Sequence, residues 1–289
     1  FVVKRAFVFL TAFILAFIAF DGLAISKFAK ADVVQNDRDE FEDIIVIDDK
    51  QCQIVITGIE PDNIFGYTLK AHFENKSTDK TYMFSVVDAA INGVQTDPFF
   101  ATEVSAEKEA NSDISFFDQE LLTNGIGDFT DIELVFRVYD SNDWSADDVA
   151  NVTVHIYPLG EEKAAVFSRE GQPTDITIVD NDNVSVIVTG YSIDDIWGYT
   201  MHLYLVNKTN MNLTFSADEV SVNGIMADPF WASTIGAGRV SFEAMSWFDS
   251  TFEENGITDV EEIEMKLRIY NSDDWSADDI YSETIVLNP

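Results

Sequence analysis

The sequence predicts an all-β protein made of two tandem antiparallel β-sandwich domains behind an N-terminal signal helix. The chain repeats itself with an offset of 132 and then 131 residues. Within each repeat, apolar and polar residues alternate with period two, which is typical of half-buried antiparallel strands. About seven short β-rich runs with close turn signals in each repeat of about 115 residues predict two packed sheets.

The internal repeat sets the expected domain limits. Its longest element, Asp143-Trp144-Ser145-Ala146-Asp147-Asp148, recurs unchanged at 274–279. Shorter matches include Thr57-Gly58 with Thr189-Gly190, Gly66-Tyr67-Thr68 with Gly198-Tyr199-Thr200, Asn75-Lys76 with Asn207-Lys208, and Asn92-Gly93 with Asn223-Gly224. We expect repeat 1 at 43–157 and repeat 2 at 174–289. The Pro-, Gly- and charge-containing segment 158–173 is expected to be a linker.

The strands of repeat 1 are expected where the alternation or the β-branched and aromatic content is strongest. Leu69, Ala71 and Phe73 are predicted to face the core, whereas Lys70 and His72 face outward. The expected strands cover 53–57, 65–74, 81–87, 99–105, 112–117, 132–139 and 149–157. Repeat 2 keeps the same pattern.

The order of short motifs resembles a known class of module. The series Thr-Gly, Gly-Tyr, Glu-Asn-Lys-Ser, Asn-Gly, Pro-Phe-Phe, Asn-Gly-Ile and Asp-Ile-Glu is similar to immunoglobulin-like (telokin-like) modules of unknown function. Those modules occur in secreted proteins and lipoproteins of Gram-positive bacteria. The resemblance covers both repeats and implies an immunoglobulin-like fold and export, without catalytic residues. The chain departs from the lipoprotein members because no cysteine that could be lipidated stands directly after its apolar leader.

The N-terminal segment 1–31 has the three parts of a secretory signal peptide. Lys4 and Arg5 precede fifteen uncharged residues, 6–20, and Ala29-Lys30-Ala31 stands before Asp32. As a helix, fifteen residues span about 22 Å, short of a hydrocarbon core of about 30 Å. We therefore expect cleavage, and contact with a membrane only through an uncleaved leader. Residues 32–42 are expected to be a flexible lead-in.

The charge balance excludes one class of partner. With 17 Lys and Arg against 52 Asp and Glu, the net charge is −35. Binding to nucleic acid is not expected, because phosphates are bound by cationic side chains. The charge is typical of a solvated surface, and affinity for cations or basic partners and adaptation to high salt remain open. Cys52 is the single cysteine and is expected in the core, so neither a disulfide nor a Cys/His zinc site is predicted.

The repeated Asp-Trp-Ser-Ala-Asp-Asp run contains the candidate ligand-binding residues, Asp143, Trp144, Asp148, Asp274, Trp275 and Asp279. Calcium is one interpretation, but an EF-hand counted from Asp140 fails where it needs a glycine and a terminal glutamate. The preferred interpretation is an acidic helical turn, with Ser145 and Ser276 as N-caps. Trp144 and Trp275 would then plug the open end of each sandwich. No metal site or cofactor is predicted.

Aromatic residues also recur at matched positions, as Phe65/Trp197, Tyr67/Tyr199, Phe100/Trp231 and Phe116/Trp247. They could stack on sugar rings, but packing in the core is the preferred interpretation. No catalytic residues are predicted, because the adjacent Asp147 and Asp148 point apart and no histidine accompanies a repeated serine and acid.

The sequence therefore predicts a secreted or surface-held, non-enzymatic binding or spacer protein of the cell envelope. Its partner is an unidentified protein or glycan. A calcium-stabilised structural repeat and a carbohydrate-binding module are the alternatives. A concave pocket with convergent polar groups would instead indicate an enzyme.

Overall fold

The computed structural model describes residues 41–98, 100–116, 118–194, 196–229 and 231–289. The expected signal peptide, 1–31, and residues 32–40 of the lead-in lie outside the described residues. Within the described part, no helix has both the length and the apolar character needed to cross a membrane.

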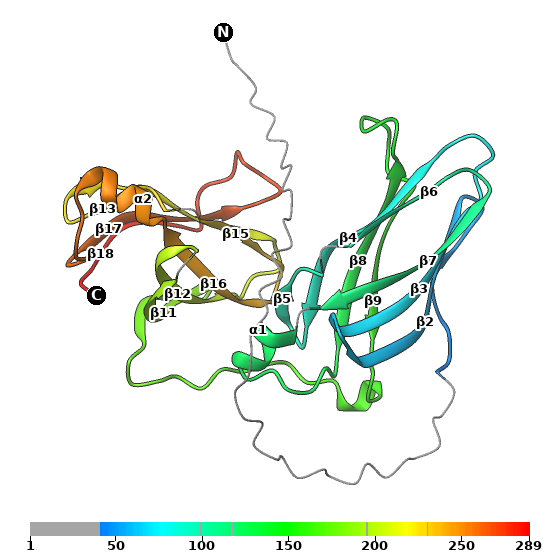
Figure 1. Cartoon of the computed structure of the whole chain (residues 1–289), viewed down its shortest axis with the longest axis horizontal. Coiled ribbons are helices and arrows are strands. Elements are labelled where there is room, and N and C mark those ends of the chain that lie inside the picture. The colour runs from blue at the N-terminus through cyan, green and yellow to red at the C-terminus, as the bar shows by residue number, and fades with distance from the viewer. Residues whose placement is uncertain (1–40, 99, 117, 195, 230) are drawn as a thin grey trace, which may run out of the picture. The chain divides into compact units, whose positions relative to one another are not determined.

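The described residues of repeat 1 form nine strands and one short helix. They are β1 (Ile44–Asp48), β2 (Cys52–Asn63), β3 (Gly66–Asn75), β4 (Tyr82–Ile91), β5 (Val94–Thr96), β6 (Ala101–Val104), β7 (Lys108–Phe116), α1 (Asp118–Thr123), β8 (Ile132–Asp140) and β9 (Ala150–Ile156). Figure 1 labels the helix and most of the strands. A 3₁₀ turn, Glu161–Lys163, follows in the linker.

Repeat 2 has the same elements in the same order. They are β10 (Ile176–Asp180), β11 (Val184–Asp194), β12 (Gly198–Asn207), β13 (Leu213–Val222), β14 (Ile225–Met226), β15 (Ala232–Ile235), β16 (Val240–Trp247), α2 (Asp249–Asn255), β17 (Ile263–Asn271) and β18 (Tyr281–Leu287). The duplication seen in the sequence is therefore a duplication of the whole fold.

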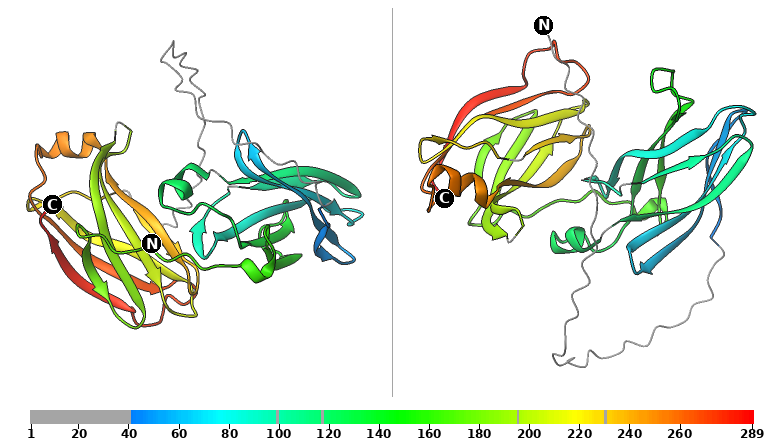
Figure 2. Two further views of the ribbon diagram at one scale, coloured as in Figure 1. Left: turned by 90° about the horizontal axis from the view of Figure 1, so that it is seen from below. Right: turned by 45° about the horizontal axis from the view of Figure 1, so that its top comes forward.

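Each repeat is a sandwich of two antiparallel sheets, which Figure 2 shows as layers. In repeat 1 the strand order is β1-β2-β3-β7 in one sheet and β5-β4-β8-β9 in the other, with β6 also paired to β4. The chain changes sheet after β3, after β6 and after β7. With β2, β3 and β7 in one layer and β4, β8 and β9 in the other, this is an immunoglobulin-like connectivity. The predicted all-β sandwich fold is confirmed.

Each sandwich has its own aromatic and aliphatic core. In repeat 1, Phe73 lies 5.4 Å from Phe84 and 6.3 Å from Phe136 between ring centroids, so the two sheets interlock through aromatic contacts. Leu69, Ala71 and Phe73 are buried as predicted. Cys52 is also in the core, and burial raises the pKa of its thiol to about 12.

Each expected strand of repeat 1 overlaps an observed one, but β2, β4 and β7 are longer than predicted, and β1, β5 and the helix were not predicted from the sequence. A single helical turn cannot produce a recognisable 3.6-residue period, and a three-residue strand cannot produce a clear alternation. These elements depend on neighbours for their pairing: β1, for example, is an edge strand that pairs with β2 through a bulge.

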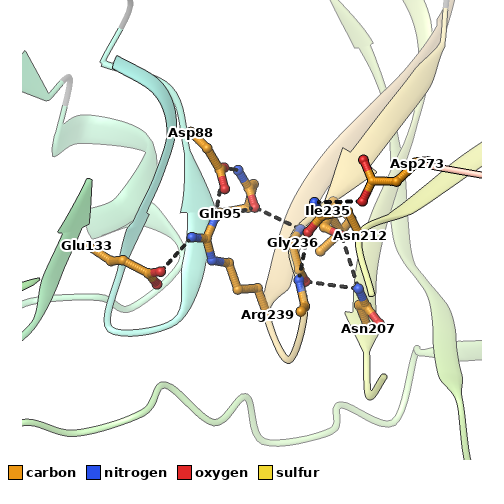
Figure 3. Close-up of polar contacts among 10 residues, drawn as sticks. Asp88, Gln95, Glu133, Asn207, Asn212, Ile235, Gly236, Arg239 and Asp273 are labelled. Carbon is orange, nitrogen blue, oxygen red and sulfur yellow. Dashed lines mark hydrogen bonds and ion pairs between the residues drawn. The ribbon is translucent and has the colours of Figure 1, made fainter. Parts of the chain in front are cut away.

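The two repeats contact each other within one compact unit. The edge strands β5 and β16 pair in parallel at Val94 and Val240. Beside them, the side chain of Arg239 is only 7% exposed and lies 2.7 Å from Asp88 and 3.0 Å from Glu133 (Figure 3). The linker packs as well, since the ring of Phe167 lies 5.7 Å from that of Phe242. Whether each repeat folds alone stays a prediction.

Candidate functional site

The repeated motif forms the loop between the last two strands of each sandwich, β8–β9 and β17–β18. Trp144 and Trp275 are 76% and 80% exposed. The prediction that they plug the open end of each sandwich is therefore wrong. We call the loops 141–149 and 272–280 the tryptophan loops.

A buried asparagine bonds backbone carbonyls at that end of each sandwich. Asn75 donates from Nδ2 to the carbonyls of Lys80 and Val104, at 2.8 Å each. Asn207 makes the equivalent bonds in repeat 2, to the carbonyl of Met211 at 2.7 Å and to that of Ile235 at 3.0 Å. Figure 3 shows Asn207 beside Ile235. A side chain that satisfies backbone carbonyls is favoured there because unpaired carbonyls at a buried end are costly.

The tryptophan loop is a turn organised by its first aspartate. Asp143 Oδ1 accepts hydrogen bonds from the Ser145 amide at 3.1 Å and the Ser145 hydroxyl at 2.7 Å. Asp274 receives the same pair from Ser276, at 3.0 and 2.7 Å. These bonds lower the pKa of both aspartates. The expected helical turn capped by serine is wrong, because the aspartate side chain accepts from the following backbone and forms a turn instead.

The second carboxylate of the motif holds an arginine on the adjacent strand. Asp148 accepts from Arg137 Nε at 2.8 Å, and Arg137 lies over the ring of Tyr139 at 4.6 Å. Tyr139 in turn contacts Trp144, with 5.6 Å between ring centroids. Each tryptophan is thus the exposed end of an Asp–Arg–Tyr–Trp series.

Repeat 2 contains the same series with nearly the same distances. Asp279 accepts from Arg268 Nε at 3.0 Å, Arg268 lies 5.3 Å from the ring centre of Tyr270, and Tyr270 lies 5.5 Å from Trp275. The arginine lowers the pKa of Asp279, and the carboxylates of Asp279 and Asp218 raise the pKa of Arg268.

The structure therefore brings all six candidate residues into two equivalent loops, but with different roles. Two aspartates shape the turn, two hold arginines, and the tryptophans face solvent. Sequence analysis did not include Arg137, Tyr139, Arg268 and Tyr270 among the site residues. The available signal was their i, i+2 spacing, which places arginine and tyrosine on one face of the strand that leads into the loop.

Two other connections lie at the same end of the sandwich as the tryptophan loop. The Ser141 amide donates to the Thr81 carbonyl at 3.0 Å, and the Glu107 amide donates to the Ser77 carbonyl at 3.0 Å. These are the β3–β4, β6–β7 and β8–β9 connections. In immunoglobulin-like domains, loops gathered at one end commonly form the recognition surface.

The described residues contain no group of three or more His, Cys, Asp or Glu side chains arranged to hold a metal ion. In the tryptophan loops, Asp143 and Asp148 already accept from Ser145 and Arg137. The calcium alternative consequently gains no support from these carboxylates.

Repeat 2 also has a cavity of about 720 Å³ over strands β11, β12 and β16 of its first sheet. Its lining comprises Ser192, Asp194, Trp197, Thr200, His202, Pro229, Trp231, Ala232, Glu243, Ala244 and Ser246. Ser192 Oγ and His202 Nε2 are 2.7 Å apart. Asp194 Oδ1 accepts from the amides of Ile196 and Trp197, and these bonds lower the pKa of Asp194.

The matched aromatic residues are divided between core and surface. Phe116 and Trp247 are fully buried, as predicted, and Phe100 is 8% exposed. Phe65 and Trp197, however, are 59% and 48% exposed, so the prediction of core packing is wrong for this pair. Both stand just before β3 or β12, outside the ladder that directs the later residues inward.

Comparisons with known proteins identify no relative that could assign a function. No protein-family model matches the chain, and no curated protein does. Among solved structures, the crystal structure of red sea bream transglutaminase has a TM-score of 0.21 at 10% identity, with 77% of this chain and 29% of that chain covered. The human OSCAR ligand-binding domain has a TM-score of 0.19 at 12% identity, with 77% and 89% covered. The chain thus spans less than a third of the transglutaminase, and neither likeness carries an argument.

Proposed function

We propose that this chain is an exported, non-enzymatic binding protein of the cell envelope that contacts a protein or glycan through Trp144 and Trp275. The observation that carries the proposal is the exposure of both indoles on supported loops. Leaving a tryptophan in water forgoes a large gain from burial. Tryptophan, tyrosine and arginine are also the residues enriched where binding energy concentrates.

The support beneath each indole favours binding over a spacer role. A spacer needs a stable sandwich but has no use for an Arg–Tyr stack that orders an exposed side chain. Restricting the tryptophan before contact reduces the entropy lost on binding. Two equivalent loops in one chain also suit a ligand with repeating units, since the second contact becomes intramolecular.

The negative charge of the chain limits the class of partner that the tryptophan loops can bind. Asp143 and Asp147 lie beside Trp144 in a protein of net charge −35. A neutral or basic surface can contact such a loop without like-charge repulsion, whereas an acidic polymer would be repelled.

Export rests on the sequence of the leader and on the resemblance to modules of secreted Gram-positive proteins. Expressed with its leader in a Gram-positive host, the protein is expected in the medium or on the cell surface with an N-terminus at or near Asp32. N-terminal sequencing of the recovered protein is the measurement. An intact leader recovered in the membrane fraction would contradict cleavage.

Binding is tested with purified cell walls, intact and protease-treated, and the full chain. The double variant Trp144→Ala/Trp275→Ala is expected to lose retention on the walls. Its free energy of unfolding should change by no more than about 0.5 kcal/mol, as for other surface substitutions. Phe65→Ala removes an exposed aromatic elsewhere and should bind like the unmodified protein. Trp247→Ala removes a buried indole and should cost about 3–5 kcal/mol of stability.

The wall samples separate the two partner classes. Retention on protease-treated walls indicates a glycan, and retention on intact walls alone indicates a protein. Unchanged retention of the double variant on both samples would sink the proposed role of the tryptophan loops.

A further inference from the structure

The cavity of repeat 2 lies over cross-strand neighbours of its first sheet. Thr200 pairs with Ser246, His202 with Ala244, and Ser192 with Thr200. These side chains point to the face opposite Met201 and Met245, which are buried in the core. Trp197 and Trp231 line the same cavity. The result is a small, mostly uncharged floor next to two large aromatic side chains.

The corresponding face of repeat 1 is occupied by an ion-pair network. Lys70 Nζ lies 2.7 Å from Glu60 and 2.8 Å from Asp113. The strand registers agree in the two copies, because Lys70 pairs with Asp113 as His202 pairs with Ala244.

The duplication therefore shows which residues distinguish the two faces. Glu60, Lys70 and Asp113 correspond to Ser192, His202 and Ala244 in repeat 2. Phe65 and Phe100 correspond to Trp197 and Trp231. Three charged side chains have shorter or neutral counterparts, and both phenylalanines have larger indole counterparts. The loss of the three charged side chains, together with the indoles of Trp197 and Trp231, favours a cavity with aromatic sides on this face of repeat 2.

The chemistry of the lining suits a sugar ring. Indole faces provide flat apolar contact, and Ser192, Thr200 and Ser246 provide hydroxyl groups that can donate or accept. The described lining residues include carboxylates but no lysine or arginine, which disfavours an anionic ligand. A volume of about 720 Å³ lies within the usual range of small-molecule sites.

Part of the site is already ordered. The carboxylate of Asp194 accepts from the Ile196 amide at 2.7 Å and the Trp197 amide at 2.8 Å, so it fixes the backbone that carries Trp197. The indole N–H of Trp231 is enclosed and has no hydrogen-bond partner in the described structure. An unsatisfied donor at the wall is costly, and a small movement toward a bound hydroxyl group would satisfy it.

We propose that this cavity binds a neutral pyranose saccharide, and that repeat 1 lacks the site because Glu60, Lys70 and Asp113 occupy the same face. This site is separate from the tryptophan loops and does not depend on their function. The Ser192–His202 contact resembles a nucleophile and base, but in the described structure no carboxylate accepts from the other nitrogen of His202. We therefore assign Ser192 and His202 a role in binding and no role in catalysis.

The test is a titration of the full chain with neutral trisaccharides built from glucose, galactose, mannose or N-acetylglucosamine. Each is added to about 10 mM, which saturates a site with a Kd of about 1 mM. The readout is the indole N–H resonance of each tryptophan in NMR spectra, assigned with Trp197→Phe and Trp231→Phe. At least one trisaccharide is expected to shift the signals of Trp197 and Trp231, whether or not it also shifts those of Trp144 and Trp275.

The control variant installs the charges of repeat 1. Ser192→Glu/His202→Lys/Ala244→Asp is expected to keep its melting temperature, since repeat 1 folds with that network, and to weaken binding at least tenfold. Phe65→Ala, the exposed counterpart of Trp197 in repeat 1, should bind the trisaccharide like the unmodified chain. The proposal is overturned if no trisaccharide shifts Trp197 or Trp231, or if the triple variant folds and binds with unchanged affinity. Shifts confined to Trp144 and Trp275 would overturn this site while supporting the tryptophan loops.

Discussion

Single residues in the tryptophan loops have roles that their neighbours determine. Asp143 and Asp274 are exposed, yet each accepts two hydrogen bonds from the serine two positions later. The charged carboxylate is the better acceptor, which explains the lowered pKa of both residues. The turn is therefore most stable when these aspartates are ionised.

The pH dependence of the loop follows from that shift. A carboxylate whose pKa is lowered by folding stabilises the turn fully at pH values above its ordinary pKa of about 3.9. This stabilisation is lost as the pH falls through the lowered pKa. The amide resonance of Ser276 is expected to titrate below pH of about 3.9. Ser276→Ala should raise the pKa of Asp274 toward the ordinary value and leave the Ser145 amide unaffected.

The two copies thus serve as controls for each other in an NMR titration. If the amide resonances of Ser145 and Ser276 both shifted with a midpoint at the ordinary aspartate pKa, the turn described here would be contradicted. An Asp274 pKa that Ser276→Ala leaves unchanged would contradict it as well.

At the scale of elements, one dipeptide forms two different structures. Asn92-Gly93 turns between β4 and β5 with positive φ angles of 53° and 79°, and Asn223-Gly224 does the same between β13 and β14. These are the values of a tight hairpin turn. Gly256, after Asn255, instead ends α2 with φ of 67° and donates its amide to Glu253 at 3.2 Å. In all three cases the glycine of Asn-Gly has a positive φ angle. The flanking elements decide whether that glycine forms a hairpin turn or ends a helix.

The strands were the most predictable elements. Alternation in 65–74 and 132–139 depends only on which side chains face the core, and β3 and β8 follow it closely. The exposure of Phe65 and Trp197 could not be read in this way, because both stand one residue outside their strand, where the alternation no longer holds.

At the scale of the whole molecule, Arg239 joins the repeats. Its guanidinium contacts Asp88 and Glu133 of repeat 1, and it also donates to Gln95 at 3.0 Å. Its counterpart at an offset of 131 is Lys108, which is exposed. The two copies have therefore diverged at this position, as they have at the cavity of repeat 2.

Removing Arg239 should weaken the coupling of the two repeats. Arg239→Ala leaves two carboxylates at the junction without their cation. Because these carboxylates are 31% and 25% exposed, water partly replaces the cation, and the loss is about 1.5–3 kcal/mol. Lys108→Ala is the matched control and should have little effect. Denaturant unfolding is followed through labelling of the buried thiol of Cys52 for repeat 1 and through the indole N–H resonance of the buried Trp247 in NMR spectra for repeat 2.

We expect the two signals to change together in the unmodified chain and to separate in Arg239→Ala. Coincident transitions in the variant, at unchanged denaturant concentration, would show that the junction contributes nothing. Residues 174–289 expressed alone are expected to fold, since the sequence predicts a complete set of strands and a core of about 115 residues. The Trp247 signal of that segment is the measurement.

The sequence by itself determined the duplication, the strand pattern, the single cysteine and the acidic surface, because each depends on composition or on residues close together in the chain. It also placed the two tryptophans in equivalent loops between the last strands. Only the tertiary structure decided that they are exposed, because each indole contacts a tyrosine on the neighbouring strand and projects from the loop into solvent. The cavity of repeat 2 and the Arg239 junction were decided in the same way. They arise from side chains on different strands, whose contacts depend on register and packing, and local periodicity contains no information about either.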